Sequence, residues 1–255
     1  MFKGLVGIIT GGASGLGRAT AELLIKQGGR VIVCDLPTSP GSDTAKQLGE
    51  NAAFVPVDVT SEQDVKNALQ TTMDKFGRLD VAVNCAGIAS ACRIYNFKKN
   101  QPFDLKLFQK TIEVNLVGTF NVIRLVAGMI GKNAPDADGQ RGVIINTASI
   151  AAFDGQIGQA AYSASKAGVV GMTLPIARDL AKQGIRVVTI APGLFRTPMM
   201  QQLPEPAIKE LEASVPFPSR LGNPHEYALL VQSIIQNTML NGEVIRLDGS
   251  LRMQP

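Results

Sequence analysis

The chain has 255 residues, of which 45% are hydrophobic and 18% charged, so it can bury one substantial core and does not have the composition of a disordered segment. A formal charge of +4 falls well short of a basic nucleic-acid stripe, and no direct nucleic-acid motif is present. Three cysteines (Cys34, Cys85 and Cys92) and one histidine, His225, lack the spacing of a metal site or a disulfide framework, so we expect no bound metal.

Short β-branched runs alternate with helical stretches along the chain. The expected strands are residues 5–9, 30–34, 53–57, 81–84, 142–146, 186–190 and 243–247. The expected helices are residues 19–27, 62–76, 105–130, 161–183 and 224–236. This alternation predicts a single α/β domain over residues 1–255: a Rossmann-type, doubly wound, parallel seven-stranded sheet with helices on both faces. Its site should lie beyond the carboxyl ends of the strands.

Three stretches are expected to be irregular, at residues 88–104, 131–141 and 195–219. The third follows the sixth strand, is rich in proline and carries Met199 and Leu203. Because it starts at the carboxyl edge of the sheet, it suits a substrate lid. The domain then divides into a cofactor half, about 1–140, and a catalytic and substrate half, about 141–255.

Two expectations concern membranes and targeting. The longest apolar stretch, residues 114–130, is interrupted by polar side chains, so we expect no membrane span. The first strand begins close to Met1, which leaves no room for a cleavable presequence.

A glycine-rich turn joins the first strand to the first helix. It runs from Thr10 and places glycine at Gly11, Gly15 and Gly17. Glycines at such a turn let the backbone approach a pyrophosphate, whose charge the helix N-terminus stabilises. The turn alone could be structural.

Asp35, at the end of the second strand, strengthens the nucleotide interpretation. Its carboxylate can accept hydrogen bonds from both ribose hydroxyls and would repel a 2′-phosphate, so NAD is preferred over NADP, although Arg18 could partly offset this charge. Asp58 and Val59 could hold the adenine edge, and the segment from Asn84 to Gly87 could flank the adenine ribose. A helix cap and a strand-end turn are the structural alternatives for these two segments.

The catalytic candidates are Tyr162, Lys166 and Ser149. Tyr162 and Lys166 are four residues apart on an expected helix and so face one cleft, and Ser149 follows the fifth strand toward the same cleft. Tyr95 and Lys99 have the same spacing, but they lie in a turn-rich stretch with alanine where a serine would be needed.

These residues suit transfer of a hydride and a proton between an alcohol and a ketone. Tyr162 would move the hydroxyl proton while Ser149 donates a hydrogen bond to the same oxygen. Acting as a base at neutral pH requires a pKa lowered by roughly 3 units from the ordinary value near 10, which Lys166 and a positively charged nicotinamide could provide. Lys166 would also bind the nicotinamide ribose, and Asn115 could hold a water that links Lys166 to solvent.

The full motif set resembles that of the short-chain dehydrogenase/reductases. It comprises Thr10 to Gly17, Asp58, Asn84 to Gly87, Asn115, Ser149, Tyr162 to Lys166 and Pro192-Gly193. The resemblance implies that the following residues contact the cofactor: Gly11, Ser14, Gly15, Leu16, Gly17, Asp35, Asp58, Val59, Cys85, Ala86, Gly87, Tyr162, Lys166, Pro192, Phe195 and Thr197.

Within that family, the stretches around Ser149 and Tyr162 and the C-terminal Arg252 to Pro255 resemble mitochondrial members that act on L-3-hydroxyacyl-CoA thioesters and hydroxysteroids with NAD. This implies a homotetramer in the mitochondrial matrix, and substrate contacts at Ser149, Tyr162, Gln156 and Gln159, although the two glutamines could equally be loop-capping amides. It also implies a possible second role, as a scaffold of mitochondrial ribonuclease P with a tRNA methyltransferase. An NADP-dependent 3-oxoacyl carrier-protein reductase is the remaining alternative.

Overall fold

A seven-stranded parallel sheet forms the centre of the computed structural model, which describes residues 1–198, 200–202 and 204–255. The strand order is β3-β2-β1-β4-β7-β8-β9. The strands are β1 (Val6–Thr10), β2 (Arg30–Asp35), β3 (Ala52–Pro56), β4 (Val81–Asn84), β7 (Gly142–Thr147), β8 (Ile185–Pro192) and β9 (Val244–Leu247). The predicted fold class and all seven predicted strands are confirmed, with ends that differ by one or two residues. Met199 and Leu203 of the expected lid lie outside the described residues.

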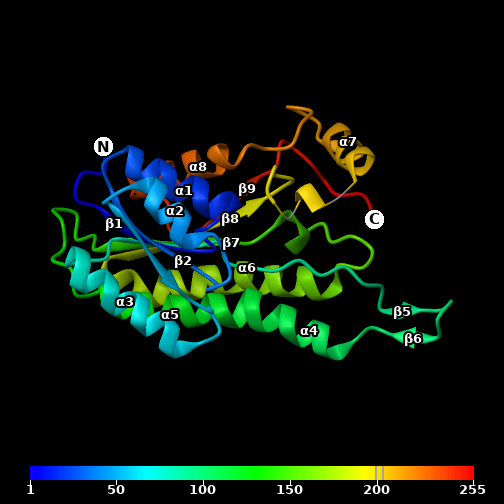
Figure 1. Ribbon diagram of the computed structural model, residues 1–255, viewed down its shortest axis with the longest axis horizontal. Coiled ribbons are helices and arrows are strands. Elements are labelled where there is room, and N and C mark those ends of the chain that lie inside the picture. The colour runs from blue at the N-terminus through cyan, green and yellow to red at the C-terminus, as the bar shows by residue number, and fades with distance from the viewer. Residues whose placement is uncertain (199, 203) are drawn as a thin grey trace.

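Helices cover both faces of this sheet. The helices are α1 (Gly15–Lys26), α2 (Gly41–Leu48), α3 (Glu62–Phe76), α4 (Leu105–Ile112), α5 (Thr119–Ile130), α6 (Ala160–Leu180), α7 (Glu205–Ser214) and α8 (Pro224–Gln236). Figure 1 shows α1, α2 and α8 on one face and α3, α4, α5 and α6 on the other. Continuous apolar strands, such as the fully buried β1, are expected where both faces are covered.

Short helical segments complete these elements. The π-helix η1 (Glu113–Gly118) joins α4 to α5, and the 3₁₀ turns are η2 (Ile150–Ala152), η3 (Ala181–Gln183) and η4 (Met200–Gln202). A π-helical turn inside a longer helix is often found at a functional site. Here it contains Asn115, one of the expected catalytic residues.

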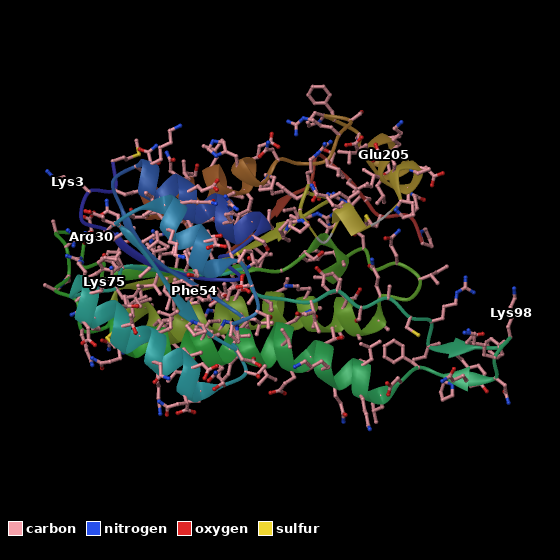
Figure 2. All side chains as sticks on the ribbon, in the orientation of Figure 1. Lys3, Arg30, Phe54, Lys75, Lys98 and Glu205 are labelled. Atoms are coloured by element: carbon pink, nitrogen blue, oxygen red, sulfur yellow. The ribbon has the colours of Figure 1, made fainter. Side chains whose placement is uncertain are left out.

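Two of the stretches expected to be irregular contain regular structure. Residues 88–104 include an antiparallel hairpin of β5 (Tyr95–Asn96) and β6 (Gln101–Pro102), and residues 195–219 include α7. The hairpin projects from the body of the protein, with Lys98 at its tip (Figure 2). The prolines around α7 are compatible with a helix because Pro206 occupies its first turn, where no intrahelical N–H donor is needed.

The long helix over Leu105–Ile130 is the one segment of the described residues with the length and composition of a membrane span. It is continuous over 26 residues with a mean hydropathy of 1.3, so by length and composition alone it could cross a membrane. Its apolar residues are instead used in the core: Val122, Ile123, Val126 and Ile130 are buried against the sheet. A helix packed on a sheet needs such an apolar face in any soluble or membrane setting.

Candidate active site

The glycine-rich turn between β1 and α1 is packed too tightly for side chains. Gly11 and Gly15 have φ angles of 63° and 51°, in the left-handed region. A Cβ on Gly11 would lie 2.8 Å from the backbone nitrogen of Ala86, and one on Gly17 would overlap the carbonyl oxygen of Gly11. Glycine is therefore required here because the turn, α1 and the end of β4 approach one another closely.

The N-terminus of α1 suits an anion. Its first turn contains no acidic side chain, and the exposed Ser14 at the N-cap makes no capping hydrogen bond. The helix therefore presents backbone N–H groups and a hydroxyl to a ligand at this point. Leu16, in the same turn, is half-buried and packs against the core.

Asp35 lies at the end of β2, beside the turn. One carboxylate oxygen, Oδ2, accepts a hydrogen bond from the Ala13 N–H at 3.0 Å, and Oδ1 accepts one from the Leu36 N–H at 2.8 Å. The carboxylate is thus held in position by two backbone donors. It retains acceptor capacity for hydroxyl groups, since each oxygen has a second lone pair.

Asp58 and Val59 follow β3 and are partly committed to the fold. The Asp58 Oδ1 accepts from the Thr60 N–H at 2.9 Å and the Thr60 hydroxyl at 2.7 Å, and these bonds hold the pKa of Asp58 below its ordinary value. The Val59 side chain is buried, and its carbonyl accepts a hydrogen bond from Asn121. Asp58 Oδ2 and the Val59 backbone N–H are the groups that fit the expected adenine contact.

The segment after β4 links the turn to the catalytic residues. The Cys85 N–H donates to the Thr10 carbonyl at 3.1 Å, and the Ala86 N–H to the Thr10 hydroxyl at 3.3 Å. A Cβ on Gly87 would lie 3.1 Å from Asn115 Oδ1 and 3.5 Å from Lys166 Nζ. The expected cofactor segment therefore approaches the expected catalytic lysine.

Tyr162, Lys166 and Ser149 come together as their spacing predicts. Tyr162 and Lys166 are one turn apart on α6, with the Lys166 ammonium 5.8 Å from the centre of the Tyr162 ring. Ser149 lies beyond the end of β7, and its hydroxyl group is close enough to Tyr162 to affect the pKa of the tyrosine. The Ser149 oxygen accepts the Ala151 N–H at 3.1 Å, a contact that uses a lone pair and not the hydroxyl proton. Tyr95, by contrast, lies on the β5–β6 hairpin and donates to Asn100 Oδ1 at 2.6 Å.

The pKa values of the two α6 residues reflect burial. Burial raises the pKa of Tyr162, and the neighbouring Ser149 hydroxyl group opposes this only in part. The lowered pKa expected from the sequence requires the positively charged nicotinamide and stays a prediction. Burial lowers the pKa of Lys166 to about 8. Both shifts have the same physical cause, because a low-dielectric setting disfavours the charged form of either group.

Lys166 has a hydrogen-bond acceptor that sequence reasoning missed. Its Nζ donates to the backbone carbonyl of Thr147, the last residue of β7, at 2.9 Å. A carbonyl carries no residue-type signal, so no motif could have indicated this contact.

The Asn115 side chain is occupied by contacts within the protein. Its Nδ2 donates to the Ile88 carbonyl at 2.9 Å and to the Ser165 hydroxyl at 3.0 Å, while Oδ1 accepts the Ile88 N–H at 2.8 Å. Ser165 in turn donates to the Tyr162 carbonyl at 2.7 Å. Asn115 therefore ties the loop after β4 to α6, and its amide has no remaining N–H for the expected water.

Gln156 and Gln159 make loop contacts. The Gln156 N–H donates to Gln159 Oε1 at 3.1 Å, Gln159 Nε2 lies 3.3 Å from Gln156 Oε1, and Gln156 Nε2 donates to the Gln254 carbonyl at 3.0 Å. These bonds fit the loop-capping alternative. They also tie the loop after Ser149 to the C-terminal segment.

The residues after β8 line the other side of the glycine-rich turn. Pro192 ends β8 and is buried. Phe195 is also buried, with its ring against Gly222, so only its backbone can face a cofactor. The Thr197 methyl group would lie 3.3 Å from a Cβ on Gly15. The start of the expected lid thus packs on the turn itself.

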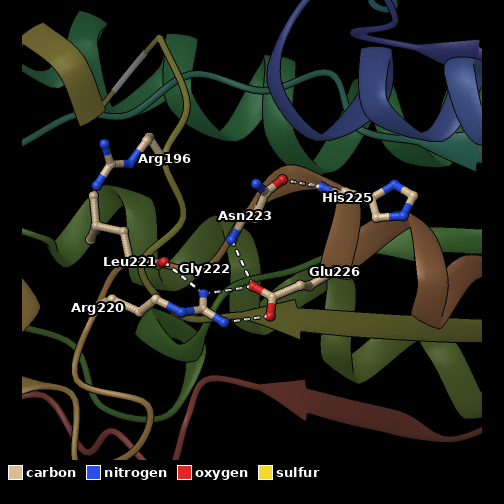
Figure 3. Close-up of a pocket in the computed structure, with 7 residues that line it drawn as sticks. All are labelled: Arg196, Arg220, Leu221, Gly222, Asn223, His225 and Glu226. Carbon is tan, nitrogen blue, oxygen red and sulfur yellow. Dashed lines mark hydrogen bonds and ion pairs between the residues drawn. The ribbon is translucent and has the colours of Figure 1, made fainter.

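A cavity at the start of α8 lies apart from Tyr162. Its volume is about 580 Å³, and it is lined by residues 196 and 220–223 with His225 and Glu226. Figure 3 shows the Arg220 guanidinium paired with Glu226, whose pKa this pairing lowers to about 2. Glu226 also completes a capping box with Asn223 at the start of α8. The ionic contacts in this cavity thus cap α8, and the candidate active site is defined by side-chain chemistry rather than cavity size.

Comparisons with known proteins agree with this site. Residues 6–207 match the family model described as short chain dehydrogenase. The chain is 67% identical to the 3-hydroxyacyl-CoA dehydrogenase type-2 of Drosophila melanogaster, covering 100% of both chains, and 67% identical to that of Homo sapiens, covering 99% of this chain and 97% of the relative. A crystal structure of 3-hydroxyacyl-CoA dehydrogenase type-2 from Mycobacterium avium is similar with a TM-score of 0.94 and 45% identity, covering 99% of this chain and 97% of that one. The chain belongs to the short-chain dehydrogenase family and is a nicotinamide-dependent oxidoreductase.

Proposed function

We propose that this protein interconverts L-3-hydroxyacyl-CoA and 3-oxoacyl-CoA thioesters with NAD, and that it also oxidises hydroxysteroids. The observation that carries the reaction type is the contact of Ser149 with Tyr162, one helical turn from the buried Lys166. The substrate class is supported by the similarity, over nearly the whole chain, to proteins named 3-hydroxyacyl-CoA dehydrogenase type-2.

The proposed roles follow from the geometry. Ser149 donates a hydrogen bond to the substrate oxygen, and Tyr162 removes or returns the hydroxyl proton. The bound nicotinamide would accept or return the hydride. Lys166 contributes a positive charge beside Tyr162, which favours the tyrosinate and so opposes the effect of burial. Asn115 keeps α6 in register with the loop after β4.

NAD is the proposed cofactor because Asp35 presents a fixed carboxylate where the adenosine ribose would lie. A 2′-phosphate at about 4 Å would be repelled by roughly 4 kcal/mol per charge pair at an effective dielectric constant near 20. The same argument disfavours an NADP-dependent 3-oxoacyl carrier-protein reductase. In this proposal residues 1–140 form the cofactor half, residues 141–255 form the catalytic half, and residues 195–219 form the lid.

Exposed apolar side chains on the helices of the sheet face opposite α8 support self-association of the protein. Val117, Phe120 and Leu174 are 41%, 48% and 45% exposed, although they are large apolar residues on the long helix and on α6. Exposed apolar side chains on neighbouring helices favour burial against a second copy. We propose a homotetramer of the mitochondrial matrix. The ribonuclease P scaffold role has no support here beyond the family resemblance.

The test is NADH oxidation by the purified protein with acetoacetyl-CoA. We expect turnover with NADH, much slower turnover with NADPH, and none in the Tyr162→Phe variant. Absence of turnover with acetoacetyl-CoA and with a hydroxysteroid, despite measurable NADH binding, would refute the proposed reaction. Light scattering on the same sample tests the tetramer.

A further inference from the structure

Tyr227 is a fully buried tyrosine whose hydroxyl group reaches the carboxyl edge of the sheet. It lies on α8, on the face opposite α6 (Figure 1), and its side chain is 0% exposed. The hydroxyl lies 2.8 Å from the Thr147 hydroxyl and 3.7 Å from the Cys85 thiol. The Thr147 hydroxyl lies 3.5 Å from the same thiol. These three polar groups therefore form one cluster between the ends of β4 and β7.

Thr147 connects this cluster to the catalytic lysine. Its side chain faces Tyr227, while its backbone carbonyl accepts the hydrogen bond from Lys166. Thr147, at the end of β7, therefore contacts Tyr227 of α8 through its side chain and Lys166 of α6 through its carbonyl. Because Thr147 is the last residue of β7, the contact made by its side chain helps to fix the position of its carbonyl group.

A buried ammonium group depends strongly on such an acceptor. Lys166 is 5% exposed, and burial lowers its pKa to about 8. The titratable groups that face Lys166 are Tyr162 on α6 and Cys85 after β4, and Tyr227 lies beyond Thr147. Among the described residues, Lys166 makes no ion pair with a carboxylate. The Thr147 carbonyl dipole is therefore a main source of stabilisation for the charged form.

We propose that Tyr227 is a positioning residue for Lys166, acting through Thr147, and that it thereby sets the charge and orientation of the lysine beside Tyr162. This inference rests on the proposed dehydrogenase function. It assigns an effect on catalysis to Tyr227, which lies on the opposite face of the sheet and in this proposal contacts neither the substrate nor Tyr162.

Two variants test the inference without removing large groups. Tyr227→Phe and Thr147→Val each delete one hydroxyl group of the pair. Each should lower kcat by about tenfold with NADH affinity changed less than about twofold. Each should also raise the pH at which alcohol oxidation is half-maximal by about half a unit, because Tyr162 feels the lysine charge less. The double variant should be no worse than either single one, since the two changes break one interaction.

The matched control is Thr173→Val. Thr173 is a buried residue two turns after Lys166 on α6, and its hydroxyl group pairs with that of Thr189 at 2.6 Å. Thr173→Val should lower the free energy of unfolding by a similar amount, and the pH profile of alcohol oxidation should not shift. An unshifted pH profile in Tyr227→Phe, or a shift of the same size in Thr173→Val, would overturn the inference, because either result would assign Tyr227 to structure alone.

A second readout separates this inference from the proposed function. In protein labelled with ¹³C at the lysine ε-carbon, the Lys166 signal is assigned by its loss in Lys166→Arg, and its pKa is read by NMR without substrate. We expect a lower pKa in Tyr227→Phe even if acetoacetyl-CoA is not turned over. An unchanged Lys166 pKa in an active enzyme refutes the inference and leaves the function standing.

Discussion

Asp35 accepts a hydrogen bond from the backbone N–H of Ala13 at 3.0 Å, so the carboxylate expected to recognise the ribose also fixes the glycine-rich turn. Two properties of the same group are therefore involved, its charge and its acceptor oxygen. Substitutions that remove one or both can separate cofactor selection from the shape of the turn.

Asp35→Ala removes both properties, and Asp35→Asn removes the charge and one of the two acceptor oxygens. We expect Asp35→Ala to weaken NAD binding by about tenfold or more and to relax discrimination against NADP, because the hydroxyl acceptor, the turn contact and the repulsive charge are all lost. Asp35→Asn should relax discrimination with a smaller loss of NAD affinity. Dissociation constants for both dinucleotides measure this, and an unchanged NAD/NADP preference would contradict the assigned role.

Tyr162→Phe should keep NADH affinity and lose nearly all turnover. The change removes the proton carrier and leaves the turn and Asp35 untouched, so binding and chemistry are affected separately. Fluorescence titration and steady-state kinetics measure the two effects. Substantial residual turnover would rule out Tyr162 as the proton carrier, and Tyr95→Phe on the exposed hairpin is the control that should behave as wild type.

Ser149→Ala should lower kcat by on the order of a hundredfold, as expected for the loss of one hydrogen-bond donor to the developing oxyanion. Ser149→Thr keeps the hydroxyl group and should recover part of the loss. The Michaelis constant should change little, since the bond strengthens mainly in the transition state. Equal activity of the alanine and threonine variants would show that the hydroxyl group has no role.

Local patterns in the chain were sufficient to predict the sheet and the catalytic residues. Strands such as β1 are buried along their whole length and mostly apolar because both faces of the sheet are covered. Tyr162 and Lys166 share a helix face by spacing alone. The short helix α2 was missed because it is mostly polar and buries few side chains. The helix α7 was missed because prolines surround it.

The missed contacts of the site are long-range. Thr147 and Tyr227 are 80 residues apart and meet only because α8 packs on a face of the sheet with its N-terminal part near the end of β7. The hydrogen bond from the Ala13 N–H to Asp35 and the hydrogen bond from Lys166 to the Thr147 carbonyl likewise depend on the tertiary structure.

The buried Lys166 should make stability depend on pH. Its pKa is about 8 in the folded protein and 10.5 when exposed, so between these values the unfolded chain binds more protons and stability rises with pH. Below pH 8 the full cost of burying the charge is present, on the order of 3 kcal/mol. Lys166→Met should therefore raise the free energy of unfolding of the cofactor-free protein at pH 7, with a difference that narrows toward pH 10. Urea denaturation at several pH values measures this, and a difference that is constant with pH would contradict the assignment.

Arg186 stabilises the fold at the end of the sheet opposite the carboxyl edge. This guanidinium is 6% exposed and donates to the carbonyls of Ile235, Asn237 and Leu240 at the C-terminal end of α8, and to Gln140. A cation there satisfies carbonyls that the helix leaves unpaired and complements the helix dipole.

Arg186→Met keeps much of the side-chain volume and removes the donors, which leaves several buried carbonyls without partners. We expect it to lower the free energy of unfolding by about 3 kcal/mol, while Arg178→Met on the exposed surface of α6 changes it by less than about 0.5 kcal/mol. Because Arg186 lies at the start of β8, at the end of the strand opposite the carboxyl edge where the candidate active site lies, kcat of the folded Arg186→Met variant at low temperature should match wild type. Chemical denaturation followed by kinetics on the same preparation measures both quantities, and a stability equal to that of Arg178→Met would show that the capping bonds contribute nothing.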